Sequence, residues 1–291
     1  MSTILVAGAS GRLGREVVDV LRSRGVAVRA LTRRPEALRA QGLAADDVVQ
    51  ADLRRAATLT GACRGVDAVI SCAGGSLDVR DLRDRTPFRA TDLAGNANLL
   101  AAARAEGVGR FVYVSVYSTP ALSRTAYVAA HEAFAEQLAR SGLAYAVVRP
   151  TGFFYVFLEY LAMARKGRGI VIGSGEARTN PIHERDVAEL CVEALDAEPG
   201  TVIDAGGPDV LTRRRAVELA FEALGREPRL TSVPAAAFGA AAAAVRPLNP
   251  RIAELLRFVA AASTNDVLAP PRGRRDMRAY FEAAAAVGRA R

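Results

Sequence analysis

Short apolar runs rich in β-branched residues alternate with longer amphipathic stretches through the first 150 residues. Apolar runs of about 4 to 8 residues between turn residues are typical of buried strands, and apolar positions at helical spacing predict the helices between them. Gly25, Gly107 and Gly142 mark predicted helix ends. The predicted strands are 4–7, 27–31, 48–50, 68–71, 111–116 and 146–149, and the predicted helices are 12–24, 36–41, 58–64, 91–106 and 124–141.

This alternation predicts an α/β fold, a Rossmann-type doubly wound parallel sheet with helices on both faces. Residues 1–150 form the predicted dinucleotide-binding domain, and the strand at 201–205 is apolar enough to return to its sheet. The rhythm loosens after Pro150, which predicts a smaller, interleaved and mostly helical substrate-cleft region at 151–291. Its predicted helices are 153–165, 184–196, 213–224, 235–245 and 249–262, with strands near 169–172 and 229–233.

The composition is that of a globular protein, because 51% of the 291 residues are hydrophobic and 24% are charged. The formal net charge is +8, but the arginines are scattered and no nucleic-acid-binding motif accompanies them. We therefore expect no nucleic-acid partner.

No apolar run is long enough to cross a bilayer, and no signal-peptide pattern precedes the first strand. These features predict a cytoplasmic protein without membrane contact. The two histidines and three cysteines lack metal-ligand spacing, so no metal site is expected.

A glycine-rich turn joins the first predicted strand to the first predicted helix, where Gly8, Gly11 and Gly14 are spaced by three residues. In such a turn the first glycine permits the sharp bend, the second lets the backbone approach a pyrophosphate, and the third lets the helix pack on the strand. The pyrophosphate then lies at the helix N-terminus, where N–H groups favour an anion.

The second strand ends in Thr32, Arg33 and Arg34, and no acidic residue stands between Asp19 and Glu36. NAD-binding proteins of this kind place a carboxylate there for the ribose 2′-hydroxyl, whereas arginines suit the 2′-phosphate. The sequence therefore predicts NADP(H) as the cofactor.

With these motifs the chain resembles the atypical short-chain dehydrogenase/reductase family, near its NmrA-like and NAD(P)-dependent epimerase-like branch. The resemblance is carried by the nucleotide loop, the Ala51-Asp52-Leu53 segment, the run from Ser71 to Gly75, and the segments 92–100, 141–153 and 180–188. It implies that Asp52 hydrogen-bonds the adenine. The cofactor-binding residues that the motifs and the resemblance imply are Gly8, Ser10, Gly11, Arg12, Leu13, Gly14, Arg33, Arg34, Asp52, Leu53, Cys72, Ala73, Gly74, Ser115, His131, Pro150, Thr151, Gly152 and Phe153.

The family pairs a catalytic tyrosine with a lysine four residues later, one helical turn away. Here that place holds Tyr127 and His131, and Lys166 is the only lysine in the chain. We interpret Tyr127 as the acid and His131 as the ribose anchor; the alternatives are a surface tyrosine and a histidine that only binds cofactor.

The substrate residues are predicted to be Tyr117, Phe154, Phe157 and His183. The aromatic residues that follow Gly152 form either a wall of the substrate pocket or part of a helix core. His183 lies either beside the substrate or at the cap of the next helix.

The leading functional hypothesis is an NADPH-dependent oxidoreductase that reduces a small apolar carbonyl, imine, enone or quinone by hydride transfer. The alternatives are a non-catalytic NADP(H)-binding redox sensor and a non-redox isomerase or cyclase on the same fold. The sequence leaves the oligomeric state open, a homodimer included.

Overall fold

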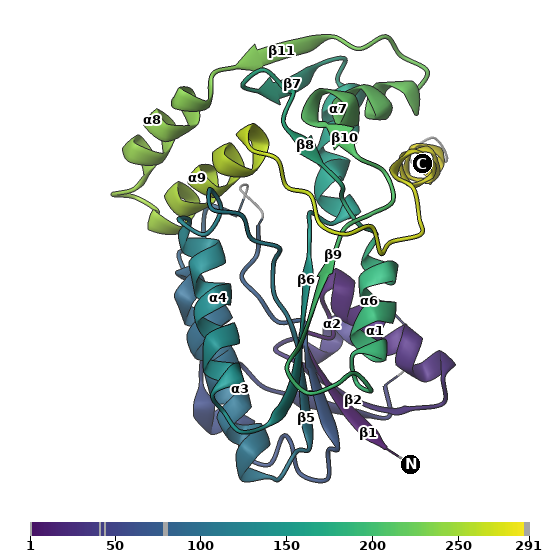
Figure 1. Ribbon diagram of the computed structural model, residues 1–291, viewed down its shortest axis with the longest axis vertical. Helices are drawn as coiled ribbons and strands as arrows, with labels where there is room; N and C mark the ends of the chain where they lie inside the picture. The colour runs from purple at the N-terminus through teal and green to yellow at the C-terminus, as the bar shows by residue number, and fades with distance from the viewer. Residues whose placement is uncertain (1, 41, 44, 78–80, 288–291) are drawn as a thin grey trace.

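The computed structural model describes residues 2–40, 42–43, 45–77 and 81–287, and its lower part in Figure 1 is a seven-stranded sheet. The strands follow the order β3-β2-β1-β4-β5-β6-β9, and each neighbouring pair is parallel. This is the predicted Rossmann-type α/β fold. The strands are β1 (Thr3–Ala7), β2 (Ala27–Thr32), β3 (Asp47–Gln50), β4 (Ala68–Ser71), β5 (Arg110–Val114), β6 (Ala144–Pro150) and β9 (Thr201–Ala205).

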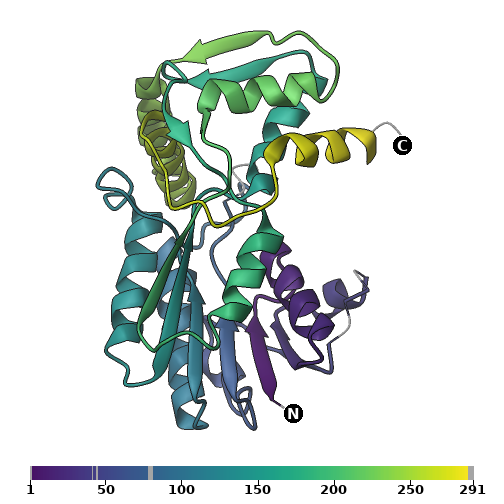
Figure 2. The same ribbon diagram turned by 45° about the vertical axis from the view of Figure 1, so that its right-hand side comes forward.

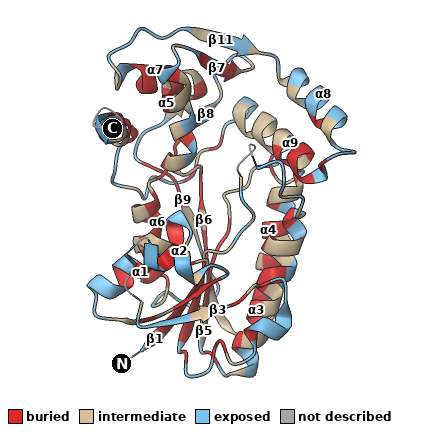
Figure 3. Cartoon of the chain, turned by 180° about the vertical axis from the view of Figure 1, so that it is seen from behind, coloured by how far each residue is buried: buried red, intermediate tan, exposed pale blue. Residues whose placement is uncertain are grey.

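Successive residues of β1 point into two different hydrophobic layers, because side chains alternate across a strand. Ile4 and Val6 belong to the cluster that packs against α1 (Arg12–Ser23) and α6 (Glu184–Glu193). Leu5 and Ala7 belong to the opposite cluster, with α3 (Ala94–Ala105) and α4 (Ala126–Ala139). Figure 3 shows many buried residues along the strands, and the central strands β1, β4 and β5 are buried on both faces, whereas the edge strands β3 and β9 are partly exposed.

The helix α6 extends the sheet-containing unit beyond residue 150. Its residues Val187, Ala188 and Cys191 are fully buried in the same cluster as the inner face of α1. Together with β9, α6 therefore belongs to the sheet-containing half, and α2 (Pro35–Ala40) completes that side.

The remaining C-terminal elements form a second body above the carboxyl ends of the strands (Figures 1 and 2). Two small sheets, β11–β7 and β10–β8, hold them together with a cluster around Phe221 and Phe281. The elements are α5 (Leu158–Arg165), β7 (Gly169–Ile172), β8 (Arg178–Thr179), β10 (Leu211–Thr212), α7 (Arg213–Glu222), β11 (Leu230–Val233), α8 (Ala235–Val245), α9 (Pro250–Thr264) and α10 (Met277–Val287).

All the strands predicted from the sequence are present, with ends that differ by up to two residues. The predicted helix at 58–64 is wrong: a short 3-10 turn (Ala56–Leu59) is followed by further turns, because Gly61 and Gly65 have positive φ angles of 72° and 69°. The helix predicted from residue 91 begins at Ala94 and is preceded by a π-helical turn, Arg89–Leu93. The pattern missed α10, and Gln41 lies outside the described residues.

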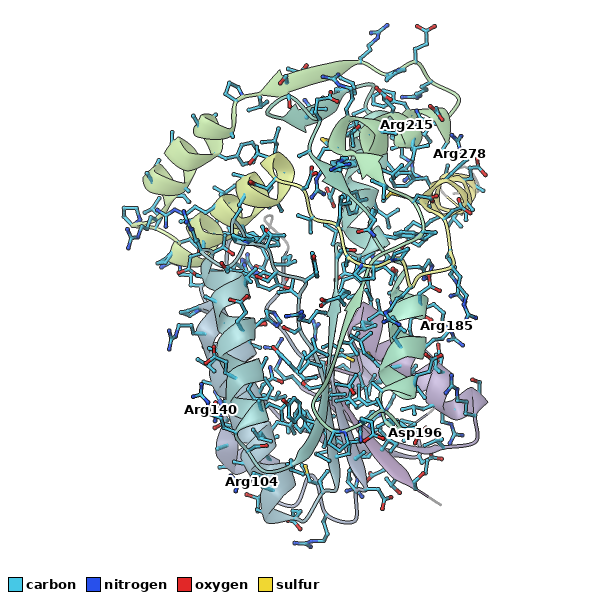
Figure 4. All side chains as sticks on the ribbon, in the orientation of Figure 1. Arg104, Arg140, Arg185, Asp196, Arg215 and Arg278 are labelled. Carbon is cyan, nitrogen blue, oxygen red and sulfur yellow. The ribbon has the colours of Figure 1, made fainter. Side chains whose placement is uncertain are left out.

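No helix in the described ranges is long and apolar enough to span a membrane. The arginines labelled in Figure 4 lie on different sides of the molecule, with Arg140 on α4, Arg185 on α6 and Arg215 on α7. Arg140, Arg185 and Arg215 each have an acidic partner, such as Glu136 for Arg140.

We predict opposite effects for alanine at two helical glycines. A Cβ at Gly14 would lie 2.2 Å from the carbonyl oxygen of Gly8, so Gly14→Ala should lower the free energy of unfolding by about 1–3 kcal/mol or more. At Gly239 in α8 a Cβ meets nothing within 4 Å, so Gly239→Ala should raise it by about 0.5–1 kcal/mol. Urea unfolding of both variants measures this, and equal stabilities would contradict the close packing at Gly14.

Candidate functional site

A cavity of about 460 Å³ lies at the carboxyl ends of β1 to β4, where the strand order reverses. Open α/β sheets bind their ligands at this position, because loops diverge there to opposite faces of the sheet. The lining residues come from the loops after four strands. They are Gly8, Ser10, Gly11, Leu31, Thr32, Arg33, Arg34, Ala51, Asp52, Leu53, Arg54, Cys72, Ala73, Gly74, Gly75, Ser76, Asp81, Asp84, Thr86 and Thr91.

The glycine loop has the geometry that its sequence predicts. Gly8 has a positive φ of 77°, and a Cβ there would meet the backbone of Ala73 at 3.1 Å. The N–H of Gly11 donates to the carbonyl oxygen of Gly8 at 2.9 Å. Gly11 is the N-cap of α1 and no side chain caps the helix, so its first turn is suited to receive an anion from the cavity.

A second pair of glycines brings the backbone after β4 close to a buried carboxylate. A Cβ at Gly74 would lie 2.9 Å from Asp92 Oδ1, and one at Gly75 would lie 3.0 Å from Oδ2. The Gly75 N–H donates to Asp92 Oδ1 at 2.9 Å. Only glycine fits here, which leaves bare backbone facing the cavity.

The end of β2 presents hydroxyl and guanidinium groups to the cavity. The Ser10 and Thr32 hydroxyls are 2.9 Å apart, and Thr32 Oγ1 accepts from the N–H of Arg34 at 3.1 Å. Arg33 and Arg34 are exposed and line the wall. This end of the cavity therefore offers donors for a phosphate group.

The C-terminal body holds the outer wall in place. Asn249, the N-cap of α9, donates from Nδ2 to the carbonyl oxygens of Leu82 and Asp84, each at 3.1 Å. The fully buried Arg251 places Nε 3.4 Å from Asp84 Oδ2. The loop that carries Asp81 and Asp84 is thus attached to α9.

Sequence reasoning found part of this wall. The predicted residues that line it are Gly8, Ser10, Gly11, Arg33, Arg34, Asp52, Leu53, Cys72, Ala73 and Gly74. The predicted residues outside it are Arg12, Leu13, Gly14, Ser115, His131, Pro150, Thr151, Gly152 and Phe153. The sequence prediction missed Arg54, Asp84 and Thr86, which also line the cavity. Arg54 could have been found from its position two residues after Asp52, whereas no sequence motif marks Asp84 or Thr86.

His131 lies in a buried network away from the cavity wall. Its Nδ1 is 2.6 Å from the Tyr113 hydroxyl, and its Nε2 is 3.2 Å from Asp92 Oδ1. Burial, with the Asp92 charge, raises the pKa of Tyr113 well above its usual value, so the phenol stays protonated and donates to Nδ1. The ring proton is then on Nε2, facing Asp92. Only Nδ1 has a hydrogen-bond partner among the described residues, and the role of His131 as a ribose anchor stays a prediction.

Tyr127 is packed among aromatic rings rather than lying on the helix surface. The rings of Phe88, His131 and Phe258 lie 4.8–5.1 Å from its own, and Phe258 comes from α9. Burial raises its pKa well above the usual value, and the charge of Asp92 adds to this. A hydroxyl in this environment is a hydrogen-bond donor at neutral pH.

The predicted substrate residues lie in three different environments. Tyr117 is half-buried in a small cluster with Leu122 and Val267. Phe154 and Phe157 are almost fully buried in the core of the C-terminal body, which is the packing alternative. His183 is the N-cap of α6 and its Nδ1 accepts from the Arg185 N–H at 2.9 Å, as the capping alternative proposed.

Two other aromatic residues of the same run face the glycine loop. Phe153 and Tyr155 stack with ring centroids 5.5 Å apart, and the Arg12 guanidinium lies 5.1 Å from the Tyr155 ring. Arg12 therefore connects the start of α1 to the loop after β6. Cys72 is a free thiol whose pKa burial raises to about 12, so it is not a nucleophile.

The residues present fit a dinucleotide. A bare-backbone cradle at Gly8 and Gly11 and an uncapped helix N-terminus match a pyrophosphate. No group of at least three His, Cys, Asp or Glu residues in the described ranges could hold a metal ion.

Fold and cavity together define a Rossmann-type dinucleotide-binding protein. The chain belongs to the NAD(P)H-binding family, whose model matches residues 8–198. This membership confirms the resemblance to the short-chain dehydrogenase/reductases.

Two relatives are similar over most of the chain. A divinyl chlorophyllide a 8-vinyl-reductase of Oryza sativa subsp. indica is 33% identical, covering 80% of this chain and 61% of the relative. A (4-alkanoyl-5-oxo-2,5-dihydrofuran-3-yl)methyl phosphate reductase of Streptomyces griseus is 31% identical, covering 77% and 74%. The chain thus spans about three fifths of the length of the plant relative.

Among solved structures, the NADPH complex of the quinone oxidoreductase QOR2 from Escherichia coli has the same fold. The TM-score is 0.70 at 22% identity, covering 89% of this chain and 88% of that one.

We predict that the Tyr113 hydroxyl contributes to stability through His131. Tyr113→Phe leaves a buried Nδ1 without a partner, which should cost about 1–3 kcal/mol. Tyr145→Phe is the control, because the Tyr145 hydroxyl makes no hydrogen bond among the described residues and its loss should change stability by less than about 0.5 kcal/mol. Chemical denaturation compares the two, and equal losses would rule out the Tyr113–His131 bond.

Proposed function

We propose that this chain is an NADPH-dependent oxidoreductase that reduces a small apolar acceptor. The observation that carries the proposal is the pair Arg33 and Arg34 in the cavity wall, at the end of a strand that offers no carboxylate of its own. Guanidinium groups match the geometry and charge of a 2′-phosphate. When bound, the nicotinamide supplies the hydride, and the protein supplies binding and orientation.

The class of acceptor follows from the surroundings of Tyr127. Tyr117, Tyr127 and Phe258 belong to one apolar cluster between α4 and α9. Aromatic and aliphatic surface of this kind favours a planar, apolar molecule such as a quinone, an enone, an imine or an aromatic carbonyl. Relatives named as reductases support reduction as the reaction.

The lack of a lysine beside Tyr127 narrows the choice of acceptor further. The described residues place no lysine near Tyr127, and the imidazole of His131 is directed to Tyr113 and Asp92. Tyr127 is therefore a protonated phenol without a cation to lower its pKa. A quinone makes the smallest demand on such a donor, because its reduced form takes protons readily from water.

A second candidate is a protein that binds NADP(H) and reports its redox state without turnover. Phe258 of α9 packs 4.8 Å from the Tyr127 ring, so the C-terminal body covers the residue that a reductase would use. This contact, and the absence of a lysine beside Tyr127, fit a non-catalytic sensor as well as they fit a reductase.

The cofactor proposal predicts a 2′-phosphate-dependent affinity. Isothermal titration calorimetry with NADPH and NADH is the direct measurement, because the chain has no tryptophan for energy transfer. Arg33→Ala should weaken NADPH binding by about 10- to 100-fold and leave NADH binding nearly unchanged.

Arg39→Ala is the matched control, since it removes the same charge from an exposed position outside the cavity wall. It should change neither affinity by more than about threefold. Equal binding of NADPH and NADH by the wild type would refute the NADPH proposal.

The catalytic proposal predicts oxidation of NADPH in the presence of quinones, followed by absorbance at 340 nm. Tyr127→Phe should reduce quinone turnover by less than about tenfold, but carbonyl reduction by about 10²- to 10⁴-fold, because only the latter needs general acid catalysis. Tight NADPH binding without oxidation by any acceptor would exclude the reductase and favour the sensor.

A further inference from the structure

One carboxylate lies in the cavity wall close to the groups that we assign to the 2′-phosphate. Asp52 follows β3, which pairs with β2, and the charge of Arg33 acts on it. An ionised carboxylate at this place repels a phosphate and competes for the arginine that would bind it. The proposed NADP(H) preference therefore requires that the charge of Asp52 be offset.

Arg54 occupies both oxygens of that carboxylate. Its Nε donates to Asp52 Oδ1 at 3.0 Å and its Nη2 donates to Oδ2 at 2.7 Å, which is a bidentate pair. The backbone N–H of Arg54 also donates to Oδ1 at 3.0 Å. These bonds hold the pKa of Asp52 at about 2, with the Arg54 side chain as the largest cause, so the carboxylate is ionised and paired at neutral pH.

The guanidinium is also held from the opposite wall. Its Nη1 donates to Thr86 Oγ1 at 3.2 Å, and Thr86 belongs to the loop that α9 secures. The turn that contains Arg54 is closed by the Arg55 N–H, which donates to the Asp52 carbonyl oxygen at 2.8 Å. The orientation of the pair is therefore set before any ligand arrives, and both residues line the cavity.

Arg54 increases the net positive charge near Arg33 and Arg34. With Arg54 present, three guanidinium groups and one carboxylate from these loops line this part of the wall. If Arg54 were removed, Asp52 would be free to turn to Arg33 and withdraw it from a phosphate.

We propose that Arg54 is a specificity-determining residue: by engaging Asp52, it keeps Arg33 and Arg34 available and lets the site select a nucleotide with a phosphorylated ribose. The inference rests on the proposed NADP(H) preference and adds a residue two strands away from the glycine loop. Arg54 acts by pairing with Asp52, and not by contacting the phosphate directly.

A double-mutant cycle tests this attribution by calorimetry with NADP⁺ and NAD⁺, which needs no substrate. Arg54→Met should lower the ratio of the NADP⁺ and NAD⁺ affinities at least tenfold, because it leaves Asp52 unpaired. Asp52→Asn alone should not lower the ratio. Asp52→Asn combined with Arg54→Met should restore it to within about threefold of the wild type, since no free carboxylate remains.

Arg55→Met is the matched control, because Arg55 is the exposed neighbour outside the cavity wall and its loss changes the net charge equally. It should leave the ratio unchanged. Should Arg54→Met fail to fold, the double variant and Asp52→Asn still provide the comparison, because neither leaves a carboxylate without its partner.

An unchanged ratio in Arg54→Met would overturn the inference while leaving the NADP(H) preference intact. A ratio lowered equally in Arg54→Met and in the double variant would also overturn it, because Arg54 would then be a direct phosphate ligand. A wild type without any preference for NADP⁺ would instead refute the proposed function on which the inference rests.

Discussion

The close approach of β1 and α1 is the constraint on which the rest of the structure depends. A Cβ on residue 14 would lie only 2.2 Å from the Gly8 carbonyl oxygen, so the first turn of α1 packs directly against the end of β1. This contact points the uncapped N-terminus of α1 toward the cavity, and it sets the face of α1 that α6 covers. The chain that returns as α6 and β9 then completes the same layer. The phosphate-binding geometry and the sandwich of helices on the sheet thus share one cause.

The electrostatic character of the cavity depends on which arginines form ion pairs, rather than on the net charge of the chain. The chain carries an excess of eight positive charges, yet several arginines, such as Arg140, Arg185 and Arg215, have local acidic partners. At the cavity Arg54 is paired with Asp52, whereas Arg33 and Arg34 belong to no ion pair among the described residues. Exposed pairs contribute little to stability, so their effect is felt mainly in which guanidinium groups remain free for a ligand.

The buried Tyr113–His131–Asp92 network joins β5, α4 and the turn that precedes α3. The carboxylate is fully buried on a π-helical turn, a feature often found at functional sites. It receives one backbone N–H and faces an imidazole, and these contacts join the loop after β4 to α4. Close by, Tyr127 keeps its proton among the rings of Phe88 and Phe258.

The sequence by itself determined the strands, the glycine loop and the arginines at the end of β2, because each is specified by residues within a few positions of one another. Short apolar runs bounded by turns favour strands, and Gly8 and Gly14 act on adjacent backbone. Only the tertiary structure decided the partners of His131, the bond from Arg54 to Thr86 and the cover that Phe258 places on Tyr127. These contacts join residues 18 to 131 positions apart in the chain, and no local pattern encodes which distant side chain arrives there. The same reason explains why Phe154 and Phe157 could not be assigned to pocket or core until α10 and α7 were in place.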